Sequence, residues 1–570
     1  MKSLHSRLLI SLSVLNLLFM HYFFYFRGYL EWTLLYSEFV NLCSVIFDVF
    51  VLATISAIIS RGKVNSTLLV AYIITFIWSF INVIYGRFFF QYLSLSAFGE
   101  IQGLRDDLVI NSILAEFHWF DFYYVASLMC FGFLYKKAPR VKINRKDVKR
   151  LFFIPLLSLI MTIMAYSSYH FVHPHYRTNW ELYKFRVKEF ISDPVSGGTP
   201  NLSHFQIGIV RVAIYELIDM FTETRLTDKQ REEIVKYYSD YSKRTTHGEK
   251  DCHVDNVIFI LLESFLSSPI DLRINGKEVT PFLNSLKRDS SVYYNDMMKS
   301  DIGCGESGDG QFIYMNGILP LTNKMTVSQV KKNVLPSFPK ILKKYLDIKH
   351  TEIIIPTRPN MWQQSDMNNV YGIDSCYAQM EIAGDLMSSI TDEQVFNYAA
   401  KSLSQAKVPF FSLILSVSTH SPYNKFLGDN ITVGSTEYSD EYNNYLNTCH
   451  YTDMHLMRYI SALKEKGLYN NSLIIIAADH YAHIDALNMR GKVDDYTPLF
   501  IINGHFNVND SWKGEFRQLD TYTTILDILN IKSEWRGLGY TLLLNNYKNS
   551  VDETSRRISK EIIEGDFFAQ

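Results

Sequence analysis

The chain has 570 residues, more than one ordinary domain needs, so its length predicts several modules. Its formal net charge is −2 at pH 7, and this balance gives no support to nucleic-acid binding. Long apolar runs are concentrated before about residue 170, whereas later residues mix charged and apolar types as in a water-soluble domain.

The amino-terminal part predicts five membrane-spanning helices, because five apolar runs approach the ~20 residues that cross a ~30 Å hydrocarbon core. The first run exceeds the apolar core of a typical signal peptide, and no small-residue cleavage pattern follows it before Arg27. We therefore expect it to be retained as a span. The runs cover residues 8–26, 39–60, 67–85, 117–135 and 151–171.

Basic residues predict the orientation of these spans. Arg7 precedes the first run, Arg61 and Lys63 follow the second, and residues 136–150 follow the fourth with eight basic side chains. Five spans place all three segments on one side, which the positive-inside rule makes cytoplasmic. This pattern predicts a multi-pass protein of the cytoplasmic (inner) membrane whose later residues lie on the outer, periplasmic side.

Ionisable residues also occur within or beside the predicted spans. Asp48 lies mid-span, Arg87 ends the third run, and Glu116, His118 and Asp121 lie near one end of the fourth. Buried charges are costly unless paired or hydrated. We expect contacts among these groups, with a lipid head group or with the catalytic domain, and a purely structural pair fits equally well.

Four of the six cysteines lie outside the predicted spans, and their spacings specify no disulfide pairing. Their redox state is left open. These cysteines are Cys252, Cys304, Cys376 and Cys449.

The composition predicts four regions. Residues 1–171 form the membrane domain, 172–250 a linker with one helix at about 227–242, 251–548 a catalytic domain, and 549–570 a polar carboxyl-terminal tail.

After residue 250, short apolar runs rich in β-branched residues alternate with longer mixed segments. This alternation predicts an α/β domain with a mostly parallel sheet covered on both faces, and ligands bind such sheets beyond the carboxyl ends of the strands. The predicted strands cover residues 257–262, 353–355, 410–415, 473–478 and 499–502.

Chemically useful side chains follow three of these strands. Glu263 follows the first, His420 follows the strand at 410–415, and Asp479 and His480 follow the strand at 473–478. Two carboxylates and an imidazole suit a divalent cation. Ser307 is a candidate fourth ligand, and its hydroxyl would become a nucleophile because a cation stabilises the alkoxide.

Ser307 lies in a glycine-rich stretch whose Gly303, Gly305 and Gly308 are expected to let the backbone turn and offer N–H groups to a phosphoryl group. Such a loop alone is an ordinary turn in roughly nine cases of ten. The joint occurrence of these residues with the strand-end acids and histidine favours a site.

Seven motifs resemble, in order, those of the lipoteichoic acid synthase type of phosphoglycerol transferase in the sulfatase-like alkaline phosphatase superfamily. Five spans before an outward-facing domain fit the same group. The motifs are NVIFILLESF, TPFLNSL, GCGESGDGQFIYMNG, STHSPY, YNNYLNTCHYTDMHLMRYI, AADHYAHI and DTYTTILDILNI.

The resemblance implies that Glu263, Ser307, Asp479 and His480 hold one divalent metal ion, in this group most often manganese, with zinc or magnesium as alternatives. It also implies that Ser307 attacks a phospholipid head-group phosphate to form a phosphoryl-enzyme ester. His420 would then steady the phosphoryl oxygens or the leaving group.

The resemblance further places Trp362 in the glycerol-phosphate pocket, and two positions depart from the family pattern. The usual nucleophile is Thr, which here is Ser307. The usual Arg two residues after the Trp is here Gln364, which removes a fixed positive charge and leaves the head group and acceptor open.

The predicted activity is transfer of a phosphoglycerol-type head group from a membrane phospholipid to a glycan or glycolipid acceptor in the cell envelope. Sulfate-ester hydrolysis is disfavoured because neither Cys304 nor Ser307 begins the Cys/Ser-x-Pro-x-Arg pattern that yields formylglycine. Two alternatives remain: a phosphodiesterase or phosphatase that uses water, and a non-catalytic surface protein with a degenerate enzyme domain.

Overall fold

The computed structural model describes most of the chain, and its described residues form two compact units. The first, the helical unit, ends at Thr222, and the second, the α/β unit, contains the described residues beyond it. The described residues are 4–26, 35–89, 92–95, 118–172, 184, 200–222, 225–239, 245, 254–322, 324–385, 389–403, 409–421, 423, 433–482, 484, 495–506, 511–544 and 547–569.

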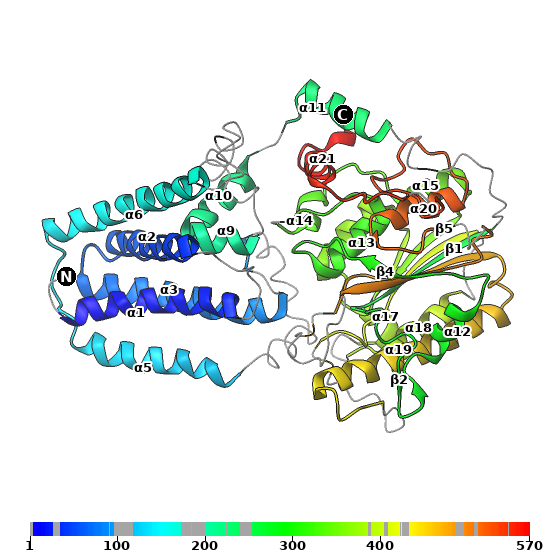
Figure 1. Cartoon of the computed structure of the whole chain (residues 1–570), viewed down its shortest axis with the longest axis horizontal. Coiled ribbons are helices and arrows are strands. Elements are labelled where there is room, and N and C mark those ends of the chain that lie inside the picture. The colour runs from blue at the N-terminus through cyan, green and yellow to red at the C-terminus, as the bar shows by residue number, and fades with distance from the viewer. Residues whose placement is uncertain are drawn as a thin grey trace. The chain divides into compact units, whose positions relative to one another are not determined.

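The helical unit contains long helices that lie side by side (Figure 1). Four of them, α1, α2, α3 and α6, are long and apolar enough to cross a membrane, as the sequence predicted. The elements of the unit are α1 (Leu4–Phe26), α2 (Leu35–Ile59), α3 (Val64–Phe89), η2 (Trp119–Asp121), α5 (Phe122–Lys136), α6 (Arg145–Val172), α9 (Pro200–Ile207) and α10 (Ile209–Phe221).

The predicted span at 117–135 corresponds to η2 followed by α5, which at ~1.5 Å per residue covers only ~22 Å. The helix nevertheless runs along the bundle. Phe19 of α1 stacks on Tyr123 at the start of α5, and Tyr72 of α3 stacks on Phe131 further along it. Four spans are therefore supported, and a fifth remains a prediction.

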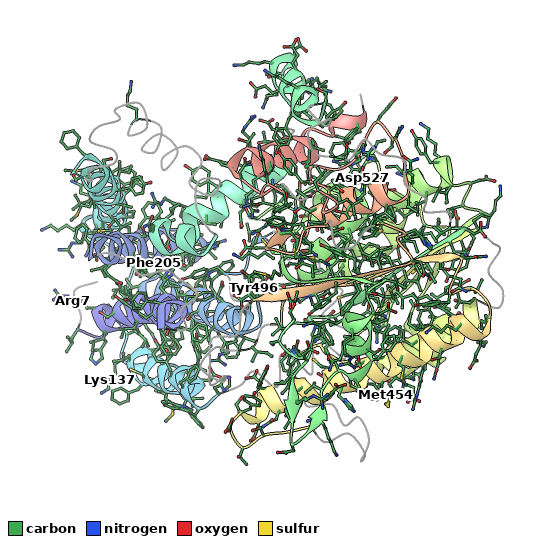
Figure 2. The ribbon with its side chains drawn as sticks, turned by 45° about the vertical axis from the view of Figure 1, so that its right-hand side comes forward. Arg7, Lys137, Phe205, Met454, Tyr496 and Asp527 are labelled. Carbon is green, nitrogen blue, oxygen red and sulfur yellow. The ribbon has the colours of Figure 1, made fainter. Side chains whose placement is uncertain are left out.

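The basic segments gather at one end of the helical unit, which we call the basic end. The turn after α2 joins the loop after α5, because the Val64 amide donates to the Val141 carbonyl at 2.9 Å. Figure 2 shows Arg7 and Lys137 at this same end. We call the opposite end, where α1 and α3 finish, the exit end.

Two ionisable groups near the exit end pair with each other, as expected. The Arg87 guanidinium donates to both carboxylate oxygens of Asp121, at 2.8 and 2.5 Å, and it lies over the ring of Phe120. The His118 amide also donates to Asp121 at 2.8 Å. This arrangement is the structural pair that the sequence left open, while Glu116 lies outside the described residues.

The α/β unit is built on an eight-stranded sheet in the order β10-β4-β9-β8-β1-β7-β5-β6. Pairing is parallel except where β9 meets β4 and β8, so the predicted mostly parallel sheet is confirmed. A separate hairpin joins β2 and β3. The strands are β1 (Asn256–Leu262), β2 (Arg273–Ile274), β3 (Lys277–Glu278), β4 (Tyr293–Lys299), β5 (His350–Ile354), β6 (Ser375–Tyr377), β7 (Phe410–Leu415), β8 (Ser472–Ala478), β9 (Tyr496–Ile502) and β10 (Phe516–Arg517).

Helices cover both faces of the sheet (Figure 1), and each face has its own apolar core. One core includes Phe312 of α13, and the other includes Tyr445 of α19. The helices are α11 (Asp228–Ser239), α12 (Pro281–Arg288), α13 (Glu306–Asn316), α14 (Thr326–Val330), α15 (Phe338–Tyr345), η4 (Met361–Gln363), α16 (Gln364–Tyr371), α17 (Gln379–Ala383), α18 (Asp392–Ser402), α19 (Asp440–Glu465), α20 (Asp520–Ile528), α21 (Glu553–Glu564) and η7 (Phe567–Ala569).

The segments before and after the predicted catalytic domain contain more helices than the sequence predicted. The predicted linker holds α9, α10 and α11, and the Thr227 hydroxyl accepts from the Gln230 amide at the start of α11. In the segment expected to be a polar tail, α21 buries Ile558 and Ile562 in the core. That segment is part of the α/β fold, because its apolar residues recur on one face of a helix.

The α/β unit has three described cysteines. Cys304 and Cys449 are buried and Cys376 is half-buried, and none of the three is in a disulfide. Cys252 lies outside the described residues.

Candidate active site

Glu263 follows the last residue of β1 and is fixed by the loop after β7. Its amide donates to the Ser416 hydroxyl at 2.9 Å, and the Thr419 hydroxyl donates to its carbonyl oxygen. The Ser264 hydroxyl donates to Glu263 Oε1 at 2.8 Å. The carboxylate is therefore held, largely buried, at the carboxyl edge of the sheet.

Asp479 and His480 follow β8, which lies parallel to β1 with Ala478 opposite Leu262. The ladder continues for one more bond, since the Asp479 amide donates to the Leu262 carbonyl at 3.2 Å. Asp479 Oδ1 accepts from the Ser264 amide at 2.8 Å. Adjacent parallel strands thus deliver two acids and an imidazole to the same place.

The tautomer of His480 is fixed by its backbone neighbour. Nδ1 lies 2.8 Å from the Tyr481 carbonyl oxygen, which can only accept, so Nδ1 carries the proton. Nε2 then faces Glu263 Oε1 at 3.6 Å and Asp479 Oδ2 at 3.7 Å. Histidines that bind metals typically donate their other ring nitrogen to a carbonyl in this way.

Ser307 lies in the first turn of α13, with Gly305 as the N-cap residue. Its Oγ is 3.3 Å from Glu263 Oε2 and 3.3 Å from His480 Nε2. Ligand atoms of Glu263, Asp479 and His480 all lie within 4.8 Å of one another. The structure therefore brings the four predicted metal ligands together from three separate parts of the chain.

Glu306, directly before Ser307, was not predicted as a site residue. Its backbone has φ of +43°, a left-handed conformation that costs a non-glycine residue about 1–2 kcal/mol. Its carboxylate lies 3.8 Å from His480 Nδ1. Strain of this kind clusters at functional sites because the surrounding fold must hold it in place.

The glycines of the loop do not act as the sequence predicted. The amides of Gly303 and Gly305 donate to Asp309 Oδ2 at 2.8 and 2.9 Å, and the Gly308 amide donates to the Gly305 carbonyl. These N–H groups are therefore used inside the protein rather than offered to a phosphoryl group. A Cβ at Gly305 would lie 2.3 Å from Asp309, so the glycine is required by that close approach.

Gly310, which the sequence reading passed over, sets the height of α13 above the sheet. A Cβ at this position would lie 2.4 Å from the Asp479 carbonyl oxygen. Only glycine lets the first turn of α13 pack directly on the end of β8. This contact places Ser307 beside Asp479 and His480.

The electrostatics of the site favour a bound cation. Burial and the neighbouring Glu263 carboxylate together raise the pKa of Asp479 to about 7. Burial opposes a charged His480, yet the carboxylates of Asp479, Glu263 and Glu306 raise its pKa to about 9. Three acids crowd one imidazole in a buried space, and a divalent cation would relieve that repulsion.

His420 lies on the loop after β7, one residue beyond the Thr419 side chain that bonds Glu263. Its Nδ1 is 2.5 Å from the Ser421 carbonyl oxygen, so Nδ1 donates and the tautomer is fixed as in His480. The ring is half-buried. The loop thus carries His420 to the sheet edge that holds Glu263.

Trp362 packs against α13, the helix that carries Ser307, because a Cβ at Gly308 would lie 3.5 Å from its side chain. Trp362 and Gln363 both have positive φ, of +50° and +49°. Gln364 is 3% exposed, and its amide donates to Asn368 Oδ1 at 2.9 Å. The structure therefore puts Trp362 next to the Ser307 helix and directs the Gln364 amide along α16.

Two positioning residues were missed by the sequence reading. Asp392, the first residue of α18, accepts from the amides of Val417 and Ser418 at 2.6 and 3.0 Å and so shapes the loop that leads to His420. Gln518 donates to the Asp479 carbonyl at 2.8 Å. Neither follows an apolar strand, so no local pattern marks them.

Comparison with known families agrees with this architecture. The family model described as Sulfatase matches residues 255–531, which contain the sheet and all seven predicted site residues. The model described as Lipoteichoic acid synthase N-terminal domain matches residues 1–178. Together the two matched models cover most of the chain in this order, which indicates that its amino-terminal part resembles that of lipoteichoic acid synthases and its later part a sulfatase-like domain.

The curated proteins that match this chain include lipoteichoic acid synthases. Lipoteichoic acid synthases of Staphylococcus aureus strains USA300 and NCTC 8325 / PS 47 are 25% identical over 426 residues, which is 72% of this chain and 62% of theirs. The chain therefore matches less than two thirds of the length of these curated relatives.

Among solved structures, the comparison finds the lipoteichoic acid synthase LtaP from Listeria monocytogenes, at 21% identity and a TM-score of 0.46 over 56% of this chain and 82% of that one. The phosphoglycerol transferase GacH from Streptococcus pyogenes, in complex with sn-glycerol-1-phosphate, has 16% identity and a TM-score of 0.41 over 61% and 94%.

Proposed function

We propose that the chain is a metal-dependent phosphotransferase that moves a phosphoglycerol-type head group from a membrane phospholipid to a glycan or glycolipid acceptor. The observation that carries the proposal is the position of Ser307 Oγ, 3.3 Å from both Glu263 Oε2 and His480 Nε2 at the start of α13. The matched family models and the name of the curated relatives support it.

In the first half-reaction Ser307 Oγ attacks the phosphorus of the lipid. A bond forms between Ser307 Oγ and phosphorus, and the bond from phosphorus to the diacylglycerol oxygen breaks. Ser307 Oγ loses its proton as it bonds to phosphorus, and the electron pair of the broken bond goes to the diacylglycerol oxygen, which takes up one proton and departs as the alcohol. His420 faces the phosphoryl oxygens and steadies the charge that develops there.

In the second half-reaction an acceptor hydroxyl attacks the phosphoserine. The new bond joins the acceptor oxygen to phosphorus, the Ser307 Oγ–phosphorus bond breaks, and the acceptor proton returns the serine hydroxyl. Trp362 would line the space for the glycerol moiety beside the Ser307 helix, and Gln364 would stand near it in place of the usual arginine.

Glu263, Ser307, Asp479 and His480 would hold the divalent cation, manganese in this proposal with zinc and magnesium as alternatives. When bound, the cation supplies a lowered pKa for the serine hydroxyl and neutralises charge on the phosphoryl group. The ligand set of oxygens with one imidazole nitrogen suits such an ion.

The proposed setting is the cytoplasmic membrane, with five spans and the α/β unit on the outer side. Lipid donor and membrane-linked acceptor would then share one surface with the enzyme, which raises their local concentration.

The test is to incubate the full-length protein, in bilayers containing phosphatidylglycerol and Mn²⁺, and to analyse its peptides by mass spectrometry. We expect a glycerophosphoryl group on the Ser307 peptide and release of diacylglycerol. Adding a glycolipid acceptor should discharge the ester into the glycolipid. Absence of any adduct, with diacylglycerol still released, would contradict the phosphoserine pathway, and discharge only to water would favour a phosphodiesterase.

A further inference from the structure

The helical unit contains a broken helix pair in the segment between α6 and the α/β unit. Helices α9 and α10 are separated by Gly208, which has φ of +86°. A Cβ at Gly208 would lie 2.5 Å from Asp48 Oδ2, so both the conformation and the space require glycine. The break is therefore a built feature of this sequence.

The break is docked on one face of α2 by three polar side chains. Asn41 donates to the Phe205 carbonyl at 2.7 Å, and Ser44 donates to the Gln206 carbonyl at 2.6 Å. Asp48 lies about one turn further along α2. The three α2 residues are at most 1% exposed. Figure 2 shows Phe205 among the helices of this unit.

The Asp48 carboxylate accepts hydrogen bonds from the first backbone amides of α10. These are the amides of Ile209 and Val210, at 2.8 and 3.1 Å. Arg211 Nε donates to the Ile207 carbonyl at the end of α9 at 2.8 Å. Because side chains satisfy the backbone groups freed at the break, the interruption is tolerable at membrane depth, where exposed peptide groups are prohibitive.

The contacts of α10 fix its depth. It begins at Asp48, near the middle of α2, ~15–20 Å from either helix end at ~1.5 Å per residue. Val212 then packs with Ile163 and Tyr166 of α6. Further along, Glu216 accepts from the Leu95 amide, which lies just beyond α3 at the exit end, at 2.9 Å. Thus α10 rises from mid-depth of the bundle to the exit end.

One face of α10 is apolar and exposed. Ile214, Leu217 and Ile218 are 48%, 46% and 57% exposed, and their spacing places them on one side of the helix. Span α6, against which α10 packs, likewise exposes Met161 and Met164. The apolar face of α10 is therefore continuous with the lipid-facing surface of a membrane-spanning helix.

We propose that α9 and α10 form a re-entrant pair and that the apolar face of α10 is buried in the lipid acyl chains of the exit-end leaflet. The chain then leaves the membrane at the end of α10 rather than at the end of α6. Asp48 is the positioning residue that holds α10 at this depth. This inference does not depend on the proposed chemistry.

The test uses a photo-crosslinking amino acid, p-benzoylphenylalanine, at Ile218 of the full-length protein in phosphatidylglycerol bilayers. We expect lipid adducts on the residue-218 peptide after illumination. Met164 on α6 is the lipid-facing control, and Lys236, exposed on α11 of the α/β unit, is the control that should form no lipid adduct. Ile214 serves as a second exposed position on the same face of α10.

Two outcomes would overturn the proposal. A cross-link from residue 218 to a peptide of the α/β unit would mean that protein covers this face. Absence of adducts at 214 and 218, with normal lipid adducts at 164, would mean that water covers it. In Asp48→Ala the lipid adduct at 218 should fall several-fold while that at 164 persists. Asp48→Asn, which keeps an acceptor for the α10 amides, should retain most of the adduct.

Discussion

The Ser307 hydroxyl lies 3.3 Å from a carboxylate oxygen and an imidazole nitrogen at once. Both distances are longer than a typical hydrogen bond from a hydroxyl, about 2.7–2.8 Å. The three groups therefore leave room for an ion between them. The chemistry proposed for this residue needs only an oxygen on Cβ. Substitutions of Ser307 that keep this oxygen should therefore keep activity.

We expect Ser307→Ala to lower diacylglycerol release from phosphatidylglycerol by at least about 1,000-fold, because removal of a nucleophile removes the covalent pathway. Ser307→Thr retains the hydroxyl and should stay within about tenfold of the wild type. Initial rates in bilayers, with metal content as a check on folding, measure both. An Ala variant that turns over lipid at a near wild-type rate would disprove the assignment.

Asp453 predicts a pH dependence of stability away from the site. This buried residue of α19 accepts from the amides of Phe282 and Leu283 at the start of α12, and burial raises its pKa from the usual 3.8 to about 7. The folded state therefore binds this proton more tightly than the unfolded state. Its contribution to stability is complete below about pH 4 and is lost as pH rises through about 7.

The matching experiment compares the free energy of unfolding of the wild type and Asp453→Asn between pH 4 and 8. The variant cannot ionise and loses one acceptor, so we expect it to be less stable at low pH. The gap should narrow by up to a few kcal/mol as pH rises. Parallel curves for the two proteins would show that Asp453 does not titrate in this range.

The closeness of Glu263, Asp479 and His480 was predictable from the sequence because each comes at the end of an apolar strand, directly or one residue on, and parallel strands share one carboxyl edge. Asp392 and Gln518 could not be predicted in the same way. Their roles exist only through backbone groups that the fold brings to them from distant segments.

At the scale of elements, the packing of α13 on β8 decides whether Ser307 reaches the acids. Gly310 makes this approach possible, since a Cβ there would meet the Asp479 carbonyl at 2.4 Å. Gly308 lies on the same helix, yet a Cβ there would meet only side-chain atoms at 3.4–3.5 Å, an ordinary contact. The pair offers a matched comparison of one added methyl group.

We expect Gly310→Ala to push α13 away from β8 and to lower both Mn²⁺ affinity and phospholipid turnover by at least about tenfold, equivalent to about 1.4 kcal/mol. Gly308→Ala should leave Mn²⁺ affinity close to the wild type. Titration of the metal by electron paramagnetic resonance reads the effect directly. Equal affinities in the two variants would show that the helix position does not control the site.

The strands with continuous apolar runs were predictable, whereas β4 was not. Its sequence, YYNDMMK, has no such run, and its residues are a mixture of buried and half-buried side chains. The antiparallel direction of β9 was equally hidden, because direction depends on how the chain returns to the sheet rather than on composition. The glycine loop was mistaken for a phosphate cradle because its bonds to Asp309 depend on the helix that follows.

At the scale of the whole molecule, the basic end of the helical unit predicts the topology. Short loops rich in Lys and Arg favour the cytoplasmic side. A thiol reagent that cannot cross membranes should therefore label Lys236→Cys of α11 in intact cells. It should label Lys142→Cys, in the loop after α5, only after lysis. Both positions are exposed. The reverse pattern would overturn the orientation.

Domain order was readable from composition, because apolar runs and interspersed charges separate cleanly along this chain. The broken pair α9–α10 was not, since its membrane depth follows from contacts with Asp48 rather than from a run of apolar residues long enough to span. The same holds for α21, whose few isoleucines become a core face only when the helix forms.

The central claim is that Glu263, Ser307, Asp479 and His480 bind one divalent ion beside the nucleophile. Electron paramagnetic resonance of the purified full-length protein with Mn²⁺ tests it most directly. The account predicts one tightly bound ion per chain, lost in His480→Ala and in Asp479→Asn and retained in His420→Ala. Unchanged binding in the first two variants would contradict it.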